Sequence, residues 1–120
     1  MRLFVFLLLF TFVCVGQTPI SAKKLNDSAL SIYKNQPQKA LEIFQQSEAL
    51  NNIGRSKRQL GFYEDALTYY LRALDIYDEL NKKEEEATVT NNIGLVYSYL
   101  GINDKAIEYH LKAKTAFEAL

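Results

Sequence analysis

Apolar residues recur at helical spacing along most of this chain. From Leu25 onward they fall three and four positions apart, which places them on one face of a helix, and no segment alternates apolar and polar residues as a half-buried strand does. Gly, Pro, Asn and Lys residues interrupt the periodicity at four places. The pattern therefore predicts an all-α chain whose helices are antiparallel neighbours, at residues 25–34, 37–60, 62–80, 84–100 and 104–120.

The strongest single pattern is an internal repeat. Asn51-Asn52-Ile53-Gly54 returns forty positions later as Asn91-Asn92-Ile93-Gly94. The same offset relates further pairs: Leu60-Gly61 to Leu100-Gly101, Ala66 to Ala106, Tyr69 to Tyr109, Leu71 to Leu111, and Ala73 to Ala113. Units of this length bury their apolar faces against one another in a stack, and such stacks usually form binding surfaces. A macromolecular partner is therefore a better expectation than a small substrate.

The repeated positions have the spacing of a known family. They are Gly54, Leu60, Gly61, Ala66, Tyr70 and Ala73 in one unit, and Gly94, Tyr97, Leu100, Gly101, Ala106 and Ala113 in the next. In this spacing the chain resembles tetratricopeptide-repeat (TPR) proteins, and its long repeat is similar to the extended repeats of kinesin light chain and of many bacterial signalling proteins. The resemblance is good over residues 47–120 and weak over 25–46. It implies an α-solenoid of antiparallel helical hairpins with about two and a half repeats.

Small residues at the repeat positions predict how the hairpins pack. Gly54 and Gly94 would allow the second helix of each hairpin to approach the first closely. Alanines on the opposing helix would leave a flat face, so that large side chains such as Tyr97 and Leu60 fill the interface. The alanines are Ala66, Ala73, Ala106 and Ala113.

Two residues depart from the repeat pattern. Lys57 stands where an aromatic residue is expected, and its stem would cover the interface while its ammonium group stays in water. His110 is the only histidine and stands where the other unit has Tyr70. No second His, Cys or carboxylate pair lies at ligand spacing, so His110 is expected to pack rather than to bind a metal or catalyse.

The N-terminus has the composition of a secretory signal peptide. Arg2 precedes an apolar run from Leu3 to Val15, about 13 residues or roughly 20 Å as a helix, which is too short for a ~30 Å hydrocarbon core. Cleavage is predicted after Gly16, with Ala22 as the alternative, and would deliver the chain to the periplasm or the extracellular space. An uncleaved anchor and a buried core helix remain alternatives.

Cysteine usage agrees with export. The only cysteine is Cys14, inside the segment predicted to be removed, so the mature chain would carry no thiol into an oxidising compartment. Cys14 would be the acylated residue of a lipoprotein, but Val13 occupies a place where such signals have Gly, Ala or Ser.

The predicted organisation has five parts: a signal peptide (1–16), a flexible lead-in (17–24), a degenerate first helical unit (25–46), a TPR unit (47–86) and a second, uncapped TPR unit (87–120). Fourteen basic and fourteen acidic residues cancel, so no overall field would attract nucleic acid or an anionic membrane. No membrane span is expected beyond the signal segment.

Both ends of the repeat region raise questions. Ser47 to Gly54 already belongs to a repeat unit, so either one helix of about 24 residues runs from Pro37 to Leu60, or a loop and helix segment is absent. At the other end, Ala113, Ala116, Phe117 and Leu120 form an apolar stripe with nothing after it. This predicts either a fragment of a longer chain or end-to-end self-association through the last helix.

The resemblance also suggests a binding site, because in this family the first helix of each hairpin lines a concave groove. The residues expected to bind a peptide there are Asn51, Asn52, Arg55, Arg58, Asn91, Asn92, Leu95, Ser98 and Tyr99. Carboxamides can bond an extended backbone without reading its sequence, and the two arginines would favour carboxylates. The alternative is that the asparagines only maintain the repeat and the arginines only solvate it. The tyrosines of the second helix are expected to pack: Tyr63, Tyr69, Tyr70 and Tyr77.

These expectations converge on an exported, non-enzymatic module that holds a peptide or protein segment in its groove. The alternative implied by the resemblance is the N-terminal sensory fragment of a longer bacterial signalling protein, a histidine kinase or a helix-turn-helix regulator. An enzyme is the third hypothesis, and the weakest, because the chain has no nucleophile–base pair and no phosphate-binding glycine loop. We predict no catalytic residue, metal site or cofactor.

Overall fold

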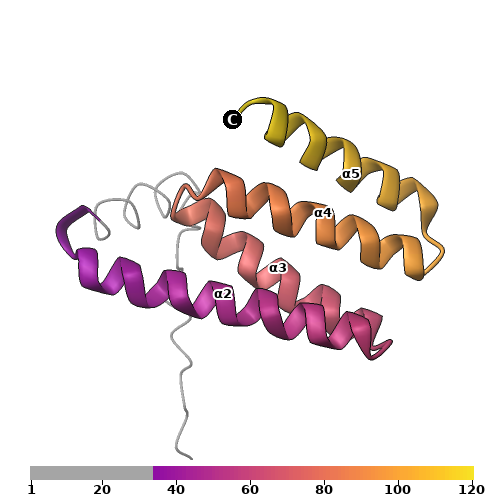
Figure 1. Cartoon of the computed structure of the whole chain (residues 1–120), viewed down its shortest axis with the longest axis horizontal. Coiled ribbons are helices and arrows are strands. Elements are labelled where there is room, and N and C mark those ends of the chain that lie inside the picture. Colours follow the sequence, from indigo (N-terminus) through magenta and orange to yellow (C-terminus); the bar gives the residue numbers. More distant parts are fainter. Residues whose placement is uncertain (1–33) are drawn as a thin grey trace, which may run out of the picture.

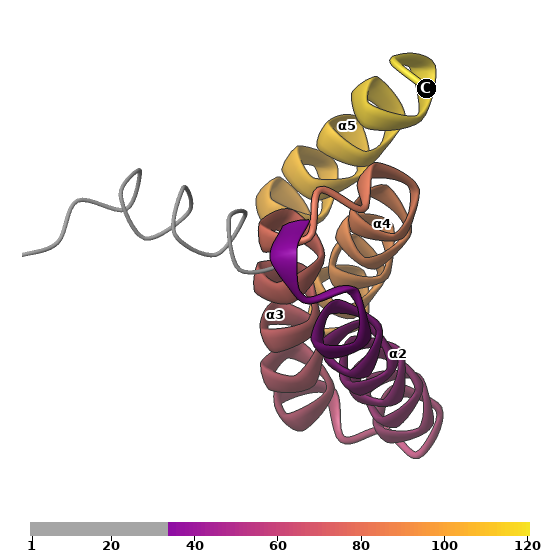
Figure 2. The same ribbon diagram turned by 90° about the vertical axis from the view of Figure 1, so that its left-hand side faces the viewer.

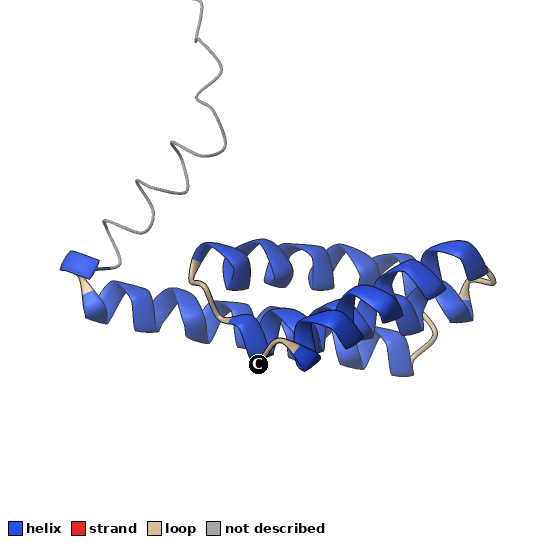
Figure 3. Ribbon diagram, turned by 90° about the horizontal axis from the view of Figure 1, so that it is seen from above, coloured by secondary structure: helices blue, strands red, loops and turns tan. Residues whose placement is uncertain are grey.

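The computed structural model describes residues 34–120, which form successive antiparallel helices. They are α2 (Pro37–Gln59), α3 (Tyr63–Glu79), α4 (Lys83–Tyr99) and α5 (Asn103–Glu118) (Figure 1). No strand occurs within this described part (Figure 3). The all-α prediction is confirmed. The predicted signal peptide, the lead-in and the helix that begins at Leu25 lie outside the described residues.

The extent of helix α2 distinguishes between the two alternatives for residues 37–60, one continuous helix or an absent loop and helix segment. It runs without a break for 23 residues, with Pro37 in its first turn, where the missing N–H costs no helical bond. Its N-terminal half packs on α3, and the rings of Phe44 and Tyr77 meet edge to face at 6.0 Å. The continuous helix is therefore correct.

Three turns of the same geometry connect the helices. The residue after each helix C-cap is left-handed: Gly61 at φ 83°, Asn81 at φ 54° and Gly101 at φ 73°. In each turn the next residue donates its N–H to a carbonyl five positions back, as Phe62 does to Lys57 at 2.9 Å. That same residue is the N-cap of the following helix, so each hairpin turn is short and its length is fixed.

The two helical glycines mark close contacts inside the hairpins, as predicted. A Cβ on Gly54 would lie 2.8 Å from ring atoms of Tyr70, and one on Gly94 would lie 2.9 Å from the His110 ring. Real Cβ atoms do not approach so closely. The two glycines therefore recur in the repeat because the helices pack closely at these positions, and not because a turn requires them.

The core lies where α2, α3 and α4 meet. Its fully buried members include Tyr70, Tyr77, Val89, Ile93 and Val96. All four repeat alanines are buried as predicted: Ala66, Ala73, Ala106 and Ala113. The tyrosines Tyr70 and Tyr77 on the second helix are likewise core residues, at 0% and 1% exposure.

Leu60 corrects one packing prediction. It was expected to fill the hairpin interface, but it is 70% exposed because it is the C-cap of α2 and lies beyond the last packed turn. Lys57 covers this end of the interface instead. Its ammonium lies 3.6 Å from a carboxylate oxygen of Asp65 and 5.2 Å from the centre of the Phe62 ring.

The last helix leaves several large apolar side chains exposed within the described part of the chain. Ile107 and Leu111 are each 58% exposed, and Phe117 is 45% exposed although its repeat counterpart Tyr77 is buried. Ala113, predicted to share the uncovered stripe, is instead buried in the last hairpin. Self-association through the last helix stays a prediction.

None of the helices described between residues 34 and 120 combines the length and apolar character needed to span a bilayer.

Candidate functional site

The first helices of the two hairpins form one side of the molecule. In the end-on view of Figure 2, α2 and α4 lie on the same side of α3, and α5 runs obliquely across the top of the molecule. The side chain of Asn92 on α4 donates an amide hydrogen to the carboxamide oxygen of Asn51 on α2, at 3.4 Å. We call the surface between these helices the α2/α4 groove. It contains this bridge at its centre and one pocket toward each end.

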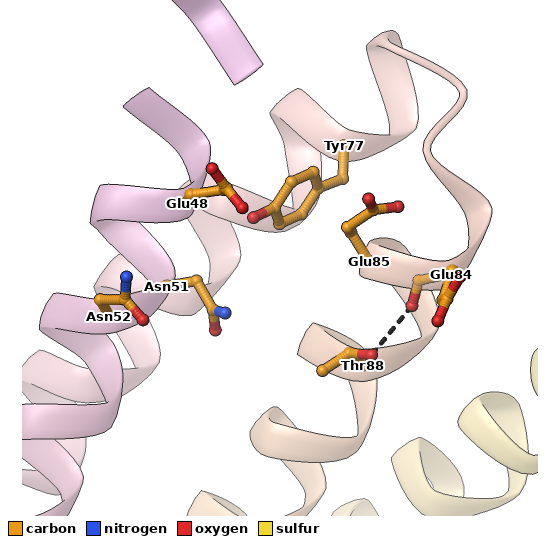
Figure 4. Close-up of a pocket in the computed structure, with 7 residues that line it drawn as sticks. All are labelled: Glu48, Asn51, Asn52, Tyr77, Glu84, Glu85 and Thr88. Atoms are coloured by element: carbon orange, nitrogen blue, oxygen red, sulfur yellow. Dashed lines mark hydrogen bonds between the residues drawn. The ribbon is translucent and has the colours of Figure 1, made fainter. Parts of the chain in front are cut away.

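The first pocket is acidic and has a volume of about 270 Å³. It lies between the middle of α2 and the start of α4, with the Tyr77 ring on α3 reaching into it (Figure 4). The lining residues are Glu48, Asn51, Asn52, Tyr77, Glu84, Glu85 and Thr88. The hydroxyl of Thr88 donates to the backbone carbonyl of Glu84 at 2.9 Å, which ties this side chain to its own helix.

The acidic residues of this pocket affect the pKa of Tyr77. Burial raises the pKa of Tyr77, a hydrogen bond with Ser47 lowers it, and the negative charges of Glu48 and Glu85 raise it further. The phenol therefore stays neutral throughout the physiological range. It gives the pocket a polar wall without adding a charge.

The second pocket lies at the C-terminal ends of α2 and α4 and has a volume of about 360 Å³. It is lined by Arg58, Gln59, Tyr63 and Tyr99. The rings of Tyr63 and Tyr99 stack in parallel, with their centroids 5.2 Å apart. Tyr99 is 58% exposed, so this stack forms an aromatic wall that remains open to solvent.

Arg58 lines this pocket with its Nε buried, and the hydroxyl of the enclosed Tyr70 is buried as well; neither atom makes a hydrogen bond of good geometry within the described residues. Burial raises the pKa of Tyr70, while the positive charge of Arg58, a hydrogen bond with the Arg58 side chain and the positive charge of Arg55 oppose part of that rise. The charge effect shows that the two guanidinium groups lie near the Tyr70 hydroxyl. Arginine side chains and a buried phenol therefore meet at one end of the groove.

The predicted peptide-binding residues divide between the groove and the hairpin interior. Asn51, Asn52 and Asn92 lie at the acidic pocket or the bridge, and Arg58 and Tyr99 line the second pocket. Arg55 and Ser98 are exposed and Leu95 is half-buried, on the same helices. Asn91 lies against α5 instead, where its carboxamide oxygen is 2.9 Å from Nδ1 of His110.

That contact defines the role of the single histidine. A carboxamide oxygen only accepts, so the bond requires a proton on Nδ1 of His110. With the ring also against Gly94, the geometry agrees with the predicted packing role. Within residues 34–120, no group of three or more His, Cys, Asp or Glu side chains is placed to hold a metal ion.

Sequence reasoning missed the acidic half of the groove. The sequence pattern did not single out Glu48, Glu84 or Glu85 as candidate binding residues. The forty-residue offset relates Glu48 to Thr88, which lines the same pocket, whereas Asn51 bonds to Asn92, one residue beyond its repeat counterpart Asn91. Glu86 does not line this pocket, and its carboxylate pairs with Lys83 at 2.8 Å.

The groove offers carboxamides, carboxylates, guanidinium groups and aromatic rings on rigid helices, a combination suited to reversible recognition of a polar chain. No curated protein and no solved structure is detectably similar to the chain. A family model described as tetratricopeptide repeat matches residues 46–119. Such repeats generally serve as scaffolds for protein–protein interaction and are typically non-catalytic. The match covers more than half of the chain, and we conclude that the protein belongs to the tetratricopeptide-repeat family.

Proposed function

We propose that this chain is an exported, non-enzymatic binding module that holds an extended segment of a partner protein in the α2/α4 groove. The observation that carries the proposal is the Asn51–Asn92 bridge, because it aligns the polar rows of two successive repeat units on one surface. The alternative of a sensory fragment stays a prediction, since a tetratricopeptide-repeat match over residues 46–119 fits both hypotheses.

The bridge leaves complementary groups for a ligand. Asn51 uses its oxygen as acceptor and Asn92 uses one amide hydrogen, so the Asn51 amide and the Asn92 oxygen remain available on the described surface. Asn52 is exposed beside them, with its donor and acceptor both open to solvent. An extended peptide presents N–H and C=O groups in alternation, which these side chains can match. Since the helices hold the groups in place before binding, little ordering entropy is lost.

The test is the double variant Asn52→Ala/Asn92→Ala. A random dodecapeptide library displayed on phage is selected against the purified protein, and the affinity of synthesised binders is measured by fluorescence anisotropy. Two lost hydrogen bonds of about 0.5–1.5 kcal/mol each predict a weakening of roughly 10- to 100-fold.

Asn91→Ala supplies the matched control, because it removes the same side chain from the same helix but faces α5. It should leave peptide affinity within about 2-fold. Circular dichroism must show unchanged helicity in all variants. Equal peptide affinity for the double variant and the wild type would reject the groove as the binding surface.

Export is the second part of the proposal, and it rests on Arg2 and the apolar run from Leu3 to Val15, outside the described residues. We expect the mature protein, recovered from the native cell envelope or medium, to begin at Gln17. Intact-mass spectrometry of the recovered chain measures this directly. A chain that retains Met1 in the cytosol would contradict export and leave the binding proposal standing.

A further inference from the structure

Two of the hairpin turns expose large apolar side chains. In the turn after α2, Leu60 and Phe62 are 70% and 54% exposed, and in the turn after α4, Ile102 is 44% exposed. The turn between α3 and α4 has Asn81 and Lys82 instead. Both apolar turns lie at the same end of the molecule, and the polar turn lies at the other end (Figure 1). We call the apolar end the tip surface, and its residues are Leu60, Phe62, Tyr63, Tyr99 and Ile102.

The tip surface is continuous across the two hairpins. Tyr63 directly follows Phe62, and its ring stacks on that of Tyr99 with the centroids 5.2 Å apart. Tyr99 lies just before the turn that contains Ile102 and is itself exposed. Apolar side chains gathered on one exposed surface commonly mark a place where a protein binds another protein or a membrane.

The apolar residues of the turns occupy positions where polar residues favour folding. Phe62 and Ile102 are the N-caps of α3 and α5, and neither helix receives a hydrogen bond from its N-cap side chain. Ser, Thr, Asp and Asn are preferred at N-caps because their oxygens bond the free N–H groups of the first turn. Lys82, the N-cap of α4, also makes no such bond, but its side chain is charged. Two exposed apolar N-caps on one surface therefore indicate a role outside the fold.

The chemistry of this end changes in a fixed order away from the turns. The aliphatic and phenyl side chains come first, the two tyrosines follow, and Lys57 and Arg58 lie in the last turn of α2. The Lys57 ammonium is 5.2 Å from the centre of the Phe62 ring, and the side chain is 35% exposed, so its charge still reaches solvent. A bilayer surface has the same order, since hydrocarbon is followed by the level where tyrosines are enriched and by the phosphates that attract cations.

The charges around the tip surface nearly balance. The cations are Arg55, Lys57, Arg58 and Lys105, and the carboxylates are Glu64, Asp65 and Asp104. A headgroup that carries both a phosphate and a quaternary amine complements such a mixture without requiring anionic lipid. Side chains that project singly from turns also suit a fluid surface, which closes around each of them. A folded partner would need a separate hollow for every one.

We propose that the tip surface binds the interface of a lipid bilayer. Leu60, Phe62 and Ile102 insert among the upper acyl chains, and the stacked tyrosines lie at the headgroup level. Tyr63 and Tyr99 also line the second pocket of the α2/α4 groove, so the groove opens beside the membrane. Membrane binding goes beyond the proposed function and requires no ligand in the groove.

The first test is the double variant Phe62→Ser/Ile102→Ser, measured by flotation with phosphatidylcholine vesicles. Losing two large apolar side chains should weaken vesicle binding about 10-fold or more. Serine is also a favourable N-cap, so the thermal unfolding temperature should stay the same or rise. A loss of binding without a loss of stability separates insertion from a structural role.

Leu41→Ser/Leu111→Ser is the matched control, because both side chains are as exposed as those of the turns but lie elsewhere, on α2 and α5. It should leave vesicle affinity within about 2-fold. Adding phosphatidylglycerol to the vesicles should change affinity by no more than about 3-fold, because the local charges nearly cancel. The groove variant Asn52→Ala/Asn92→Ala should bind vesicles as the wild type does.

The second test locates the tip itself. The chain has no tryptophan, so a single introduced one is the only source of indole fluorescence. In Phe62→Trp, the emission should move to shorter wavelength when vesicles are added, and brominated acyl chains should quench it. Leu41→Trp should show neither change. All variants share one N-terminus, so the apolar run from Leu3 to Val15 contributes equally to each.

Three results would overturn membrane insertion. One is an unchanged emission spectrum for Phe62→Trp, and another is equal vesicle affinity for the wild type and Phe62→Ser/Ile102→Ser. The third is a double variant that loses stability together with binding, which would assign the two side chains to the fold. Capture of a protein that depends on the tip surface, with no vesicle binding, would assign this surface to protein docking instead. The proposed function of the groove would stand in each case.

Discussion

Replacing Ile93 with alanine is expected to lower the free energy of unfolding by about 2–4 kcal/mol. Ile93 on α4 is completely buried, so truncation loses apolar burial and leaves a cavity in the core that joins the two hairpins. Folded domains are stable by about 5–15 kcal/mol, so this single change would remove a large part of the total. Urea denaturation followed by circular dichroism at the helical minimum measures the loss.

The repeat itself provides the control. Ile53 is the same residue at the same repeat position on α2, but it is 41% exposed. Ile53→Ala should lower the free energy of unfolding by no more than about 1 kcal/mol. The partly exposed Ile53 side chain buries less apolar surface on folding than Ile93 does, so less burial is lost. Equal losses at the two positions would show that the hairpins do not stack as described.

Placing valine at Gly54 is expected to destabilise the first hairpin by about 3 kcal/mol or more. The first added carbon would already lie 2.8 Å from the Tyr70 ring, and that ring is enclosed on all sides, so α2 and α3 must separate. The same denaturation experiment measures the loss. Ser56→Val, two residues along α2 on an exposed position, is the control and should change stability by only a few tenths of a kcal/mol.

The second hairpin should tolerate the corresponding change better. A Cβ on Gly94 meets His110, whose side chain is half-buried and can swing outward, although it then loses its bond to Asn91. We therefore expect Gly94→Val to cost less than Gly54→Val. The reverse order would mean that the enclosure of Tyr70 does not determine the penalty.

Most of the fold could be predicted because the same pattern of small and apolar residues occurs in two repeat units. The helix predicted at residues 62–80 is observed as Tyr63–Glu79, and the glycine and alanine contacts follow from repeat positions that need small side chains. Leu60 was misplaced because its periodicity continues into the helix C-cap, where no neighbouring helix reaches it. Periodicity identifies the apolar face of a helix, but it does not show how far the neighbouring helix extends along that face.

The candidate site was only partly predictable, because it depends on how one hairpin is rotated against the next. Asn91 and Asn92 are adjacent in sequence, but one contacts α5 and the other contacts α2. Likewise, Glu48 and Glu85 come together across two helices, and Tyr63 meets Tyr99 between hairpins. None of these pairs has a local sequence signal.

The hairpin turns have a consequence for how this groove can evolve. In each turn, the residue that closes the preceding helix by a hydrogen bond is also the N-cap of the following helix, so the turn has no spare residue. A single residue inserted in the turn at Asn81 would therefore rotate α4 by about 100° about its axis. Such an insertion would carry Asn92 away from Asn51 and separate the two polar rows. Side chains along the groove can therefore be exchanged freely to suit a new ligand, whereas the lengths of the turns cannot change. Diversification of this surface is expected through substitutions alone.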